Sequence, residues 1–438
     1  MSGQALTSGA LAERFAGLHP KLIDLSLGRI QRLLRDLGDP HERLPPTIHV
    51  AGTNGKGSTV AFLRAFYEAA GKRVHADTSP HLVRVNERIR LAGRLVDDER
   101  LIDALDRVER INAGAPITIF EILTAAAFDL FAATPADVLL LEVGLGGRFD
   151  STNVIESPVA TVIAPVSMDH CEFLGDSVEK IAGEKAGILK LGAPAIIGEQ
   201  EPAALRVIER AAMKARAPLT VAGRDYHVHE EGGRLVFEDS RGLLDLPLPR
   251  LAGRHQFANA GLAIATIRRL HPEFSTRHLE VGMREATWPA RLQKLRPGPL
   301  TALAPEGSEV WLDGAHNDAG GKVLAEAMAD IEDGRPAPLI LITASLKSKD
   351  TRAFLAHFKG LVHEALTVAI PGDHSARTPE DVAAMAREVG LNAAASGTVA
   401  QALRSLAARP WPKPPRVLIA GSLYLAGAVL ERNGEAPT

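Results

Sequence analysis

The residues most able to do chemistry lie in the segment HVAGTNGKGST, residues 49–59. Its three glycines allow a tight turn that exposes backbone N–H groups to an anion. Lys56 adds a cation that reaches the β- and γ-phosphates of a nucleotide. Ser58, or less favourably Thr59, adds a hydroxyl for Mg²⁺. The segment therefore predicts a phosphate-binding loop, with Mg²⁺ as a cofactor.

The spacing of this loop differs from the common pattern of Gly, four residues, then Gly-Lys-Ser/Thr. Val50 stands where the first glycine belongs, and Gly57 separates Lys56 from the hydroxyl residues. A glycine-rich turn without function is the alternative interpretation. The apolar run before the loop and the helical pattern after it favour phosphate, because a helix N-terminus there carries a partial positive charge.

Further magnesium ligands are expected at the ends of other strands on the same edge of a parallel sheet. Glu142 ends the run VLLLE, His170 follows VIAPVSMD, and Ser79 follows VHADT. An acid at the end of an apolar strand is costly unless it is paired or bound to a metal. Each residue also has a structural alternative: Glu142 could pair with Arg148, Ser79 could cap a helix, and His170 could be half-buried.

The elements that must position these residues alternate along the chain, as in an α/β fold with a mostly parallel sheet. The predicted strands of the N-terminal part are TIHVAG, RVHADT, ADVLLLEVG and PVATVIAPV, and the predicted helices include 57–70, QFANAGLAIATIRRL and LEVGMREATW. Unbroken apolar runs are typical of parallel strands that are buried on both faces. Residues 219–248 alternate in type and turn at Glu231-Gly232-Gly233, which predicts an antiparallel hairpin.

A Pro/Gly-rich joint, LRPGPL, precedes a second α/β series with the predicted strands EVWLDGAH, PLILITAS, EALTVAI and PRVLIAGS. We expect a domain at 1–295 that contains the phosphate loop and a smaller Rossmann-like domain at 296–438. A chain of 438 residues is long enough for both.

Composition excludes some classes of function. There are 50 Lys and Arg against 53 Asp and Glu, a net charge of −3, and aromatic residues make up 4% of the chain. A nucleic-acid partner needs basic stripes or stacking platforms, so none is expected. The start MSGQALTSGALAERF lacks the pattern of a signal peptide, and the run 417–430 is too short to span a bilayer. With Cys171 as the single cysteine, we expect a cytoplasmic protein.

Seven ordered blocks together resemble folylpolyglutamate synthase and dihydrofolate synthase, the folate branch of the Mur ligase superfamily. The blocks are HVAGTNGKGST, SPHLVRVNERIR, FEILTAAAF, LEVGLGGRFDSTN, DHCEFLG, GEKAGILK and LDGAHN. The resemblance runs from about residue 23 to residue 430, and the variant loop spacing is the one that this superfamily uses. It implies a P-loop domain of the Mur ligase central type, followed by a Rossmann-like domain that works in glutamate ligation.

The resemblance implies a reaction in which ATP, a folate carboxylate and the amine of L-glutamate give an amide, ADP and phosphate through an acyl phosphate. The substrates would be dihydropteroate and reduced folates, and the enzyme would act as a monomer. The implied ATP-binding residues are Gly52, Thr53, Asn54, Gly55, Lys56, Gly57, Ser58, Asn259, Arg291, Asp313 and His316. The implied ligands of two Mg²⁺ sites are Ser58, Ser79, Glu142, His170 and Lys185.

In the resembled family, the lysine that Lys185 matches is carried as a carbamate, which reverses its charge and offers two oxygens to a metal. Lys56, Lys185 and His170 are the implied catalytic residues. From the residues alone, the preferred interpretation of Lys185 is a surface helix lysine that pairs with Glu184. The implied pterin-binding residues are Asp24, Phe120, Glu121, Phe149 and Asp150, and Phe120 could also be core.

Three alternatives remain at this point. A polyglutamate synthase without dihydrofolate synthase activity would share every block. A cell-wall Mur ligase usually has a UDP-binding domain before the loop, and the 51 residues that precede Gly52 are too few for one. A non-catalytic nucleotide-binding regulator would lack the metal ligands and the lysine of GEKAGILK.

Overall fold

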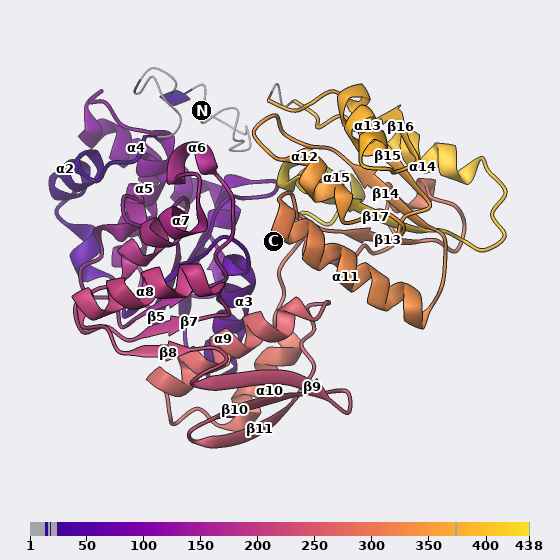
Figure 1. The fold of residues 1–438 in the computed structure, drawn as a ribbon. Coiled ribbons are helices and arrows are strands. Elements are labelled where there is room, and N and C mark those ends of the chain that lie inside the picture. Colours follow the sequence, from indigo (N-terminus) through magenta and orange to yellow (C-terminus); the bar gives the residue numbers. More distant parts are fainter. Residues whose placement is uncertain (1–13, 16–17, 19–23, 373–374, 438) are drawn as a thin grey trace. The chain divides into compact units, whose positions relative to one another are not determined.

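The computed structural model describes residues 14–15, 18, 24–372 and 375–437. Ile23 and the first thirteen residues, most of the segment expected not to be a signal peptide, lie outside the described residues. The chain divides into two compact units (Figure 1). The first contains Met1–Arg250 and Gln256–Thr287, and the second contains Leu251–His255 and Trp288–Thr438. No helix of the described chain combines the length and apolar character needed to cross a bilayer.

The first unit is built on a sheet in which eight described strands follow the order β4-β3-β2-β5-β1-β6-β7-β8. From β2 to β8 all neighbours are parallel, and the β3–β4 edge is antiparallel. The bounds are β1 Thr47–Ala51, β2 Val74–Asp77, β3 Ile89–Leu91, β4 Arg94–Leu95, β5 Val138–Glu142, β6 Ala160–Ile163, β7 Ala195–Ile197 and β8 Leu219–Val221. This confirms the four predicted strands and the mostly parallel sheet.

The register of the central strands brings the predicted chemistry to one edge. Val50 of β1 is level with Glu142 of β5, and Asp77 of β2 is level with Leu141. The carboxyl ends of β1, β2 and β5 therefore meet at one edge of the sheet, where the phosphate loop begins.

Helices cover this sheet and pack in pairs, α3 with α10, α4 with α5 and α7 with α8; Figure 1 shows α7 and α8 next to each other. The α-helices are α2 Gly28–Asp36, α3 Lys56–Ala69, α4 Asp98–Asn112, α5 Ile119–Ala133, α6 Cys171–Leu174, α7 Val178–Lys185, α8 Pro202–Ala215, α9 His255–Leu270 and α10 Thr276–Glu285. Short 3₁₀ turns are η1 Pro40–Arg43, η2 Val85–Arg88, η3 Ser151–Val154 and η4 Ala186–Ile188. The predicted helices correspond to α3, α9 and α10.

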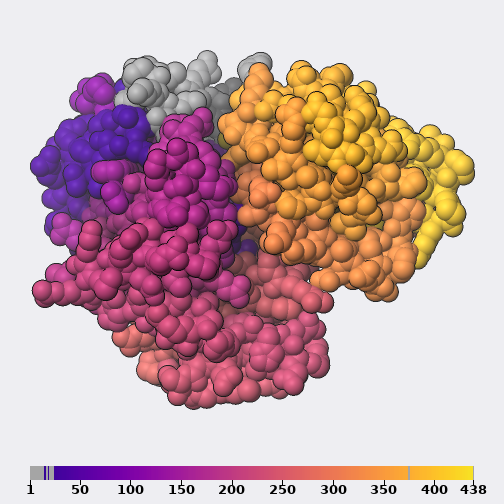
Figure 2. Space-filling model, viewed as in Figure 1, coloured from indigo at the N-terminus to yellow at the C-terminus, as the bar shows by residue number. Residues whose placement is uncertain are grey.

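The antiparallel extension has three strands rather than the two of a hairpin, and it covers fewer residues than the predicted 219–248. Strands β9 (Tyr226–Glu231), β10 (Arg234–Asp239) and β11 (Gly242–Pro247) form a three-stranded sheet, which lies at the surface of the first unit in Figure 2. The β9–β10 turn falls at the predicted glycines. Leu219–Val221 belongs instead to the parallel sheet as β8, because it pairs with β7.

The second unit contains a six-stranded sheet in the order β12-β13-β17-β14-β15-β16, flanked by helices (Figure 1). The strands are β12 Gln293–Lys294, β13 Glu309–Leu312, β14 Leu339–Thr343, β15 Glu364–Val368, β16 Ala393–Gly397 and β17 Arg416–Ala420. The helices are η5 Thr301–Leu303, α11 Asp318–Gly334, α12 Thr351–Ala356, α13 Pro379–Glu388, α14 Val399–Ala407 and α15 Leu423–Asn433. All four predicted strands are present. β16 was missed because its sequence, AAASG, has low β propensity.

The Pro/Gly-rich joint does not separate the two compact units. The backbone N–H of Arg296 donates to Glu435 Oε1 (2.9 Å) and that of Leu300 donates to Asn433 Oδ1 (3.2 Å), so the joint is bound to the end of α15. Strand β12 pairs with β13 before the joint is reached. The first compact unit therefore ends at Thr287 and the second continues from Trp288, whereas the expected boundary was 295/296.

Candidate active site

The loop between β1 and α3 has a conformation that its glycines make possible. Gly52 has φ +147° and Gly55, the residue before α3, has φ +87°, a region that favours glycine. A Cβ at Gly52 would lie 2.7 Å from Ala164 Cβ, and one at Gly55 would lie 2.4 Å from Asn259 Oδ1. The loop is further held by Thr53, whose N–H donates to Pro165 O (2.9 Å). Asn259, a predicted ATP-binding residue, therefore lies directly against the loop.

Hydroxyl residues of the first turn of α3 face the interior. Ser58 is 2% exposed and Thr59 is fully buried. The Thr59 hydroxyl has no hydrogen-bond partner among the described residues. Asn54 lies near Ser167, with 3.5 Å between Nδ2 and the serine Oγ. The structure thus places the residues of the predicted loop at one strand-to-helix junction.

Two lysines that are distant in sequence meet at the carbonyl oxygen of Gly52. Lys56 Nζ donates to it at 3.2 Å, and Lys185 Nζ, at the end of α7, donates to it at 2.8 Å. Lys56 Nζ also lies 3.9 Å from Glu142 Oε1. The structure therefore brings together the phosphate-loop lysine, the predicted carbamylated lysine and one predicted metal ligand.

Lys185 is not the surface lysine of the alternative interpretation. It is 5% exposed, and Glu184 forms its ion pair with Arg148 (3.7 Å) instead. Burial, and secondarily the charge of Lys56, lower the pKa of Lys185 to about 7, while Asp169 and Asp150 oppose this change. A large share of Lys185 is therefore a neutral amine near pH 7.

The other predicted metal ligands differ in their surroundings. Glu142 is 5% exposed. Among the described residues its ion pair is with Lys56, whereas Arg148 pairs with Glu184. The Ser79 hydroxyl is buried and has no hydrogen-bond partner in the described chain. The His170 side chain is 40% exposed, with Nε2 3.9 Å from Asp169 Oδ2. Two hard oxygen donors and an imidazole suit a divalent cation.

Within the described residues, the one group of three His, Cys, Asp or Glu side chains close enough to share an ion is Asp39, His41 and Glu42. These residues are half-buried or exposed. The predicted ligand set relies on two serines and a lysine besides Glu142 and His170, so it is not a cluster of this kind.

Asp77 is an acid near the predicted metal ligands that sequence reasoning missed. Burial, opposed by the charge of Arg88 and aided by those of Asp150 and Glu142, raises the pKa of Asp77 to about 8. Its position at the end of β2, beside the strand that ends in Glu142, was the available signal. The same pattern of an acid at the end of an apolar strand had singled out Glu142.

Two predicted pterin residues are aromatic and lie differently. A Cβ at Gly144 would meet Phe120 Cζ at 2.3 Å, so the Phe120 ring lies on the glycine loop after β5. The guanidinium of Arg88 lies 5.9 Å from the centre of that ring. Phe120 is half-buried rather than part of the closed core, whereas Phe149 is 44% exposed.

The predicted acids Asp24 and Glu121 are bridged by Arg29, which sequence reasoning missed. Arg29 Nη1 lies 2.7 Å from Asp24 Oδ2, and Arg29 Nε lies 3.0 Å from Glu121 Oε2. The same Glu121 oxygen accepts from Thr118 at the start of α5. Glu121 Oε1 is buried without a hydrogen-bond partner among the described residues. Arg29 follows the predicted acid Asp24 by five residues, and a cation so close to a predicted acid was the available signal.

Asp150 is 2% exposed and stabilises its own loop. Its carboxylate accepts hydrogen bonds from Leu145 N (2.8 Å) and Thr152 N (3.0 Å). Burial raises its pKa, and these hydrogen bonds oppose that increase. The structure therefore gives Asp150 a structural task whether or not it also meets a substrate.

The three predicted ATP-binding residues of the second unit form one group. Asp313 Oδ2 accepts a hydrogen bond from Leu292 N (2.6 Å), and Oδ1 accepts one from Ala315 N (2.7 Å). Burial raises the pKa of Asp313, and the charge of Arg291 opposes that rise. His316 Nδ1 lies 2.8 Å from Gly314 O. His255 also lies here: burial, and then Arg291, lower its pKa to about 4.

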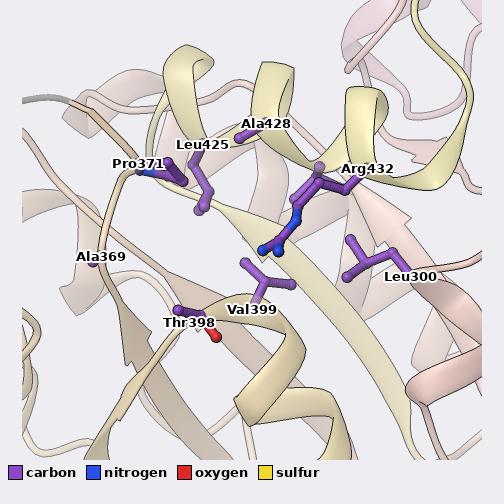
Figure 3. A pocket seen from close by; sticks show the side chains of 9 residues that line it. Leu300, Ala369, Pro371, Thr398, Val399, Leu425, Ala428 and Arg432 are labelled. Atoms are coloured by element: carbon purple, nitrogen blue, oxygen red, sulfur yellow. The ribbon is translucent and has the colours of Figure 1, made fainter.

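The second unit also contains a pocket, and its lining shares no residue with this group. Figure 3 shows apolar side chains of α14 and α15 with Arg432 among them. Its lining residues are Leu300, Ala369, Pro371, Thr398, Val399, Leu425, Ala428, Val429 and Arg432. None of them is a predicted site residue.

Comparison with known proteins decides the family. Residues 50–267 match the Mur ligase middle domain. The chain is 37% identical to the dihydrofolate synthase/folylpolyglutamate synthase of Bacillus subtilis, over 77% of this chain and 79% of that protein. It is 33% identical to the folylpolyglutamate synthase of Lacticaseibacillus casei, over 92% of each.

The chain belongs to the dihydrofolate synthase/folylpolyglutamate synthase family. Among solved structures of this family, E. coli FolC in complex with DHPP and ADP matches with a TM-score of 0.86 at 31% identity, over 98% of both chains. A bifunctional folylpolyglutamate synthase/dihydrofolate synthase with Mn, AMPPNP and L-glutamate bound matches with a TM-score of 0.83 at 27% identity, over 98% of this chain and 99% of that chain. The resemblance seen in the seven sequence blocks and the predicted fold class are both confirmed.

Proposed function

We propose that this protein is an ATP-dependent ligase that adds L-glutamate to dihydropteroate, giving dihydrofolate, and to reduced folates, giving folylpolyglutamates. The observation that carries the proposal is the convergence of Lys56 and Lys185 on the Gly52 carbonyl beside buried Glu142. The bacterial relatives that carry both activities in their names favour both reactions over polyglutamate synthesis alone.

The reaction needs two steps. A carboxylate is a poor acyl donor because its leaving group would be oxide, so its oxygen first takes the γ-phosphoryl group of ATP and releases ADP. The glutamate amine then attacks the acyl carbon, the C–N bond forms, the C–O bond to phosphate breaks, and the amine loses a proton. The protein mainly positions the reactants and offsets their charge.

The phosphate loop would hold ATP through its backbone N–H groups and Lys56. Ser58, Ser79, Glu142 and His170 would hold Mg²⁺ at two sites, and their oxygen and imidazole donors suit that ion. When bound, Mg²⁺ would neutralise the charge that develops on the transferred phosphoryl group. Asn259, Arg291, Asp313 and His316 are the remaining proposed ATP contacts.

Lys185 is proposed to carry a carbamate. The neutral amine attacks CO₂, an N–C bond forms, one C–O double bond of CO₂ becomes a single bond, and one proton leaves the nitrogen, so a neutral amine becomes a carboxylate-like anion. The modified nitrogen keeps one hydrogen, which still donates to Gly52 O. The low pKa of the buried amine supports this step. The change of sign would let Lys185 assist a cation rather than repel it.

The folate substrate is proposed to contact Asp24, Phe120, Glu121, Phe149 and Asp150. Phe120 on Gly144 offers an aromatic face, and Glu121 Oε1 offers a buried acceptor for the amine and amide N–H groups of a pterin. The chain has one cysteine, which fits a reducing compartment, so we place the enzyme in the cytoplasm. We also propose that it acts as a monomer.

Product analysis tests the proposal. With ATP, Mg²⁺ and L-glutamate, dihydropteroate is expected to give dihydrofolate and one ADP per turnover, and reduced folates offered separately are expected to gain glutamate residues. Formation of AMP would exclude the acyl-phosphate route. Extension of reduced folates without any use of dihydropteroate would restrict the enzyme to polyglutamate synthesis.

A further inference from the structure

A buried chain of hydrogen bonds joins β1 to the loop that follows β5. His49 of β1 and Thr152 of η3 are both fully buried, with 2.9 Å between His49 Nε2 and Thr152 Oγ1. Thr152 Oγ1 in turn lies 2.5 Å from Asp150 Oδ1. Neither His49 nor Thr152 has a role in the proposed chemistry. The chain ends on an acid that does.

The chemistry of the three groups sets the direction of the hydrogen bonds. The carboxylate of Asp150 already accepts from the N–H groups of Leu145 and Thr152, so the short contact makes Thr152 the donor. A threonine hydroxyl has one hydrogen, so its lone pairs accept from His49. His49 must therefore carry its proton on Nε2.

His49 is neutral in this position. Burial, and secondarily the charge of Lys190, lower its pKa to about 3. Its Nδ1 is buried and has no hydrogen-bond partner among the described residues. An apolar residue would fill this site without leaving a buried ring nitrogen unsatisfied. His49 therefore lowers the stability of the core through its unsatisfied Nδ1, and its Nε2–H hydrogen bond to Thr152 offsets this loss.

The loop that receives this bond is also held from its other side. Asn153 Nδ2 donates to Gly187 O (3.1 Å), and Lys190 Nζ donates to Asn153 O (3.2 Å). Arg148 N donates to Glu184 O (2.8 Å). The loop is therefore fixed both to the strand that leads into the phosphate loop and to the segment 184–190, which contains Lys185.

We propose that His49 is a positioning residue: its Nε2–H, acting through Thr152, holds Asp150 and the loop 144–153 where the folate substrate binds. The inference rests on the proposed function, because it takes Asp150 and Phe149 to face the substrate. It adds a residue that touches no substrate yet sets substrate affinity. His49 lies in the strand that enters the phosphate loop, so the link also relates the placement of the two substrates.

Four variants test the link from both ends. In His49→Gln the amide nitrogen reaches the place of Nε2, whereas in His49→Asn the shorter side chain does not. The two variants bury the same amide group, so they share its polar cost. Thr152→Ser keeps the hydroxyl, and Thr152→Val removes it with little change of shape. Steady-state KM and kcat are measured for dihydropteroate and for ATP, together with the thermal unfolding midpoint.

We expect His49→Asn and Thr152→Val to raise the KM for dihydropteroate by about tenfold, the effect of losing one hydrogen bond in a chain that ends on a charged group, with the KM for ATP within about twofold. His49→Gln and Thr152→Ser should keep both constants within about threefold. The double variant His49→Asn/Thr152→Val should be no worse than the poorer single variant, because both break one chain.

A merely structural role for His49 would give a different pattern. His49→Gln and His49→Asn would then lower the unfolding midpoint equally, and the two KM values would move together or not at all; either result overturns the inference. A parent enzyme that uses neither dihydropteroate nor reduced folates would refute the proposed function instead. The two failures are therefore distinct.

Discussion

Two groups of ionisable side chains, one in each unit, are buried in opposite ways. In the first unit, Lys185 hydrogen-bonds a carbonyl oxygen, and burial drives its pKa down to about 7. Asp77, at the same sheet edge, has its pKa raised to about 8. Both shifts move the group toward its neutral form, so the surroundings do not fully compensate the charge.

Around Glu309 in the second unit, charge is instead matched by opposite charge. Arg416 of β17 has a side chain that is 5% exposed, and it pairs with Glu332 and with Glu309 (3.1 Å). Lys294 and Arg335 add two more cations at Glu309. These hydrogen bonds outweigh burial and hold the pKa of Glu309 down at about 2. The network favours the charged forms.

This difference separates a site arranged for reaction from a network arranged for stability. Incompletely compensated charge costs folding free energy, and it persists where a bound ion, substrate or covalent change completes it. Compensated charge needs no further partner. Three predictions examine this contrast, in order of decreasing effect.

The largest effect is expected at Lys185. Lys185→Ala should lower turnover by at least about 10³-fold, because a preorganised charge and its effect on the neighbouring cation are both lost. Lys185→Arg should be equally inactive, since it keeps a positive charge and cannot be carbamylated. Short carboxylates added to Lys185→Ala should restore part of the activity by occupying the vacated space. Lys180→Ala, at an exposed lysine of the same helix, is the matched control.

The carbamate itself is tested on the parent enzyme. A crystal grown with bicarbonate should show density for three further atoms beyond Lys185 Nζ. An unmodified lysine there, with full activity in CO₂-depleted buffer, would remove Lys185 from the mechanism and would make its low pKa a consequence of burial alone.

A smaller effect is expected at Lys56. Lys56→Ala should lower kcat by roughly 10²–10³-fold, the usual loss when one charge on a transferring phosphoryl group is removed. The fold should be intact, because the hydrogen bonds of Lys56 Nζ within the described residues go to two loop carbonyls, those of Gly52 and Thr53, and Glu142 lies 3.9 Å away. Turnover within a few-fold of the parent, at an unchanged unfolding midpoint, would contradict the role of Lys56 in binding phosphate.

The smallest effect concerns stability at Glu309 and depends on pH. The pKa of Glu309 in the folded protein, about 2, lies below its ordinary value of 4.5, so its ionised form stabilises the fold above pH 4.5. That contribution should be lost as the pH falls from 4.5 to 2. Glu309→Gln should lower the free energy of unfolding at pH 7 by about 1–2 kcal/mol. Activity measured under native conditions should be unchanged.

Denaturant unfolding of the parent and of Glu309→Gln at pH 7, 5 and 3 measures this difference. The difference in the free energy of unfolding between the two proteins should be constant from pH 7 to pH 5 and smaller at pH 3. A difference that is independent of pH would mean that the network around Glu309 acts by packing and not by charge.

Local sequence was sufficient for much of this molecule. The apolar runs predicted the central strands because a parallel strand that is buried on both faces has no polar side to show. The glycines and Lys56 predicted the loop because φ values of +147° and +87° at Gly52 and Gly55 are open to few other residues. The expected domain boundary at 295/296 differs from the division of the compact units at Thr287/Trp288, because a Pro/Gly-rich segment looks alike whether it is a hinge or, as here, is bound by Asn433 and Glu435.

Only the tertiary structure decided how the charged residues act. The sequence by itself left Lys185 as either a surface residue or a site residue, and placed Asp77, Arg29 and His49 in no site. Burial, and neighbours more than a hundred residues away such as Gly52 for Lys185 and Thr152 for His49, set their protonation and partners. Periodicity and composition report on neighbours along the chain, whereas a pKa or a tautomer depends on neighbours in space.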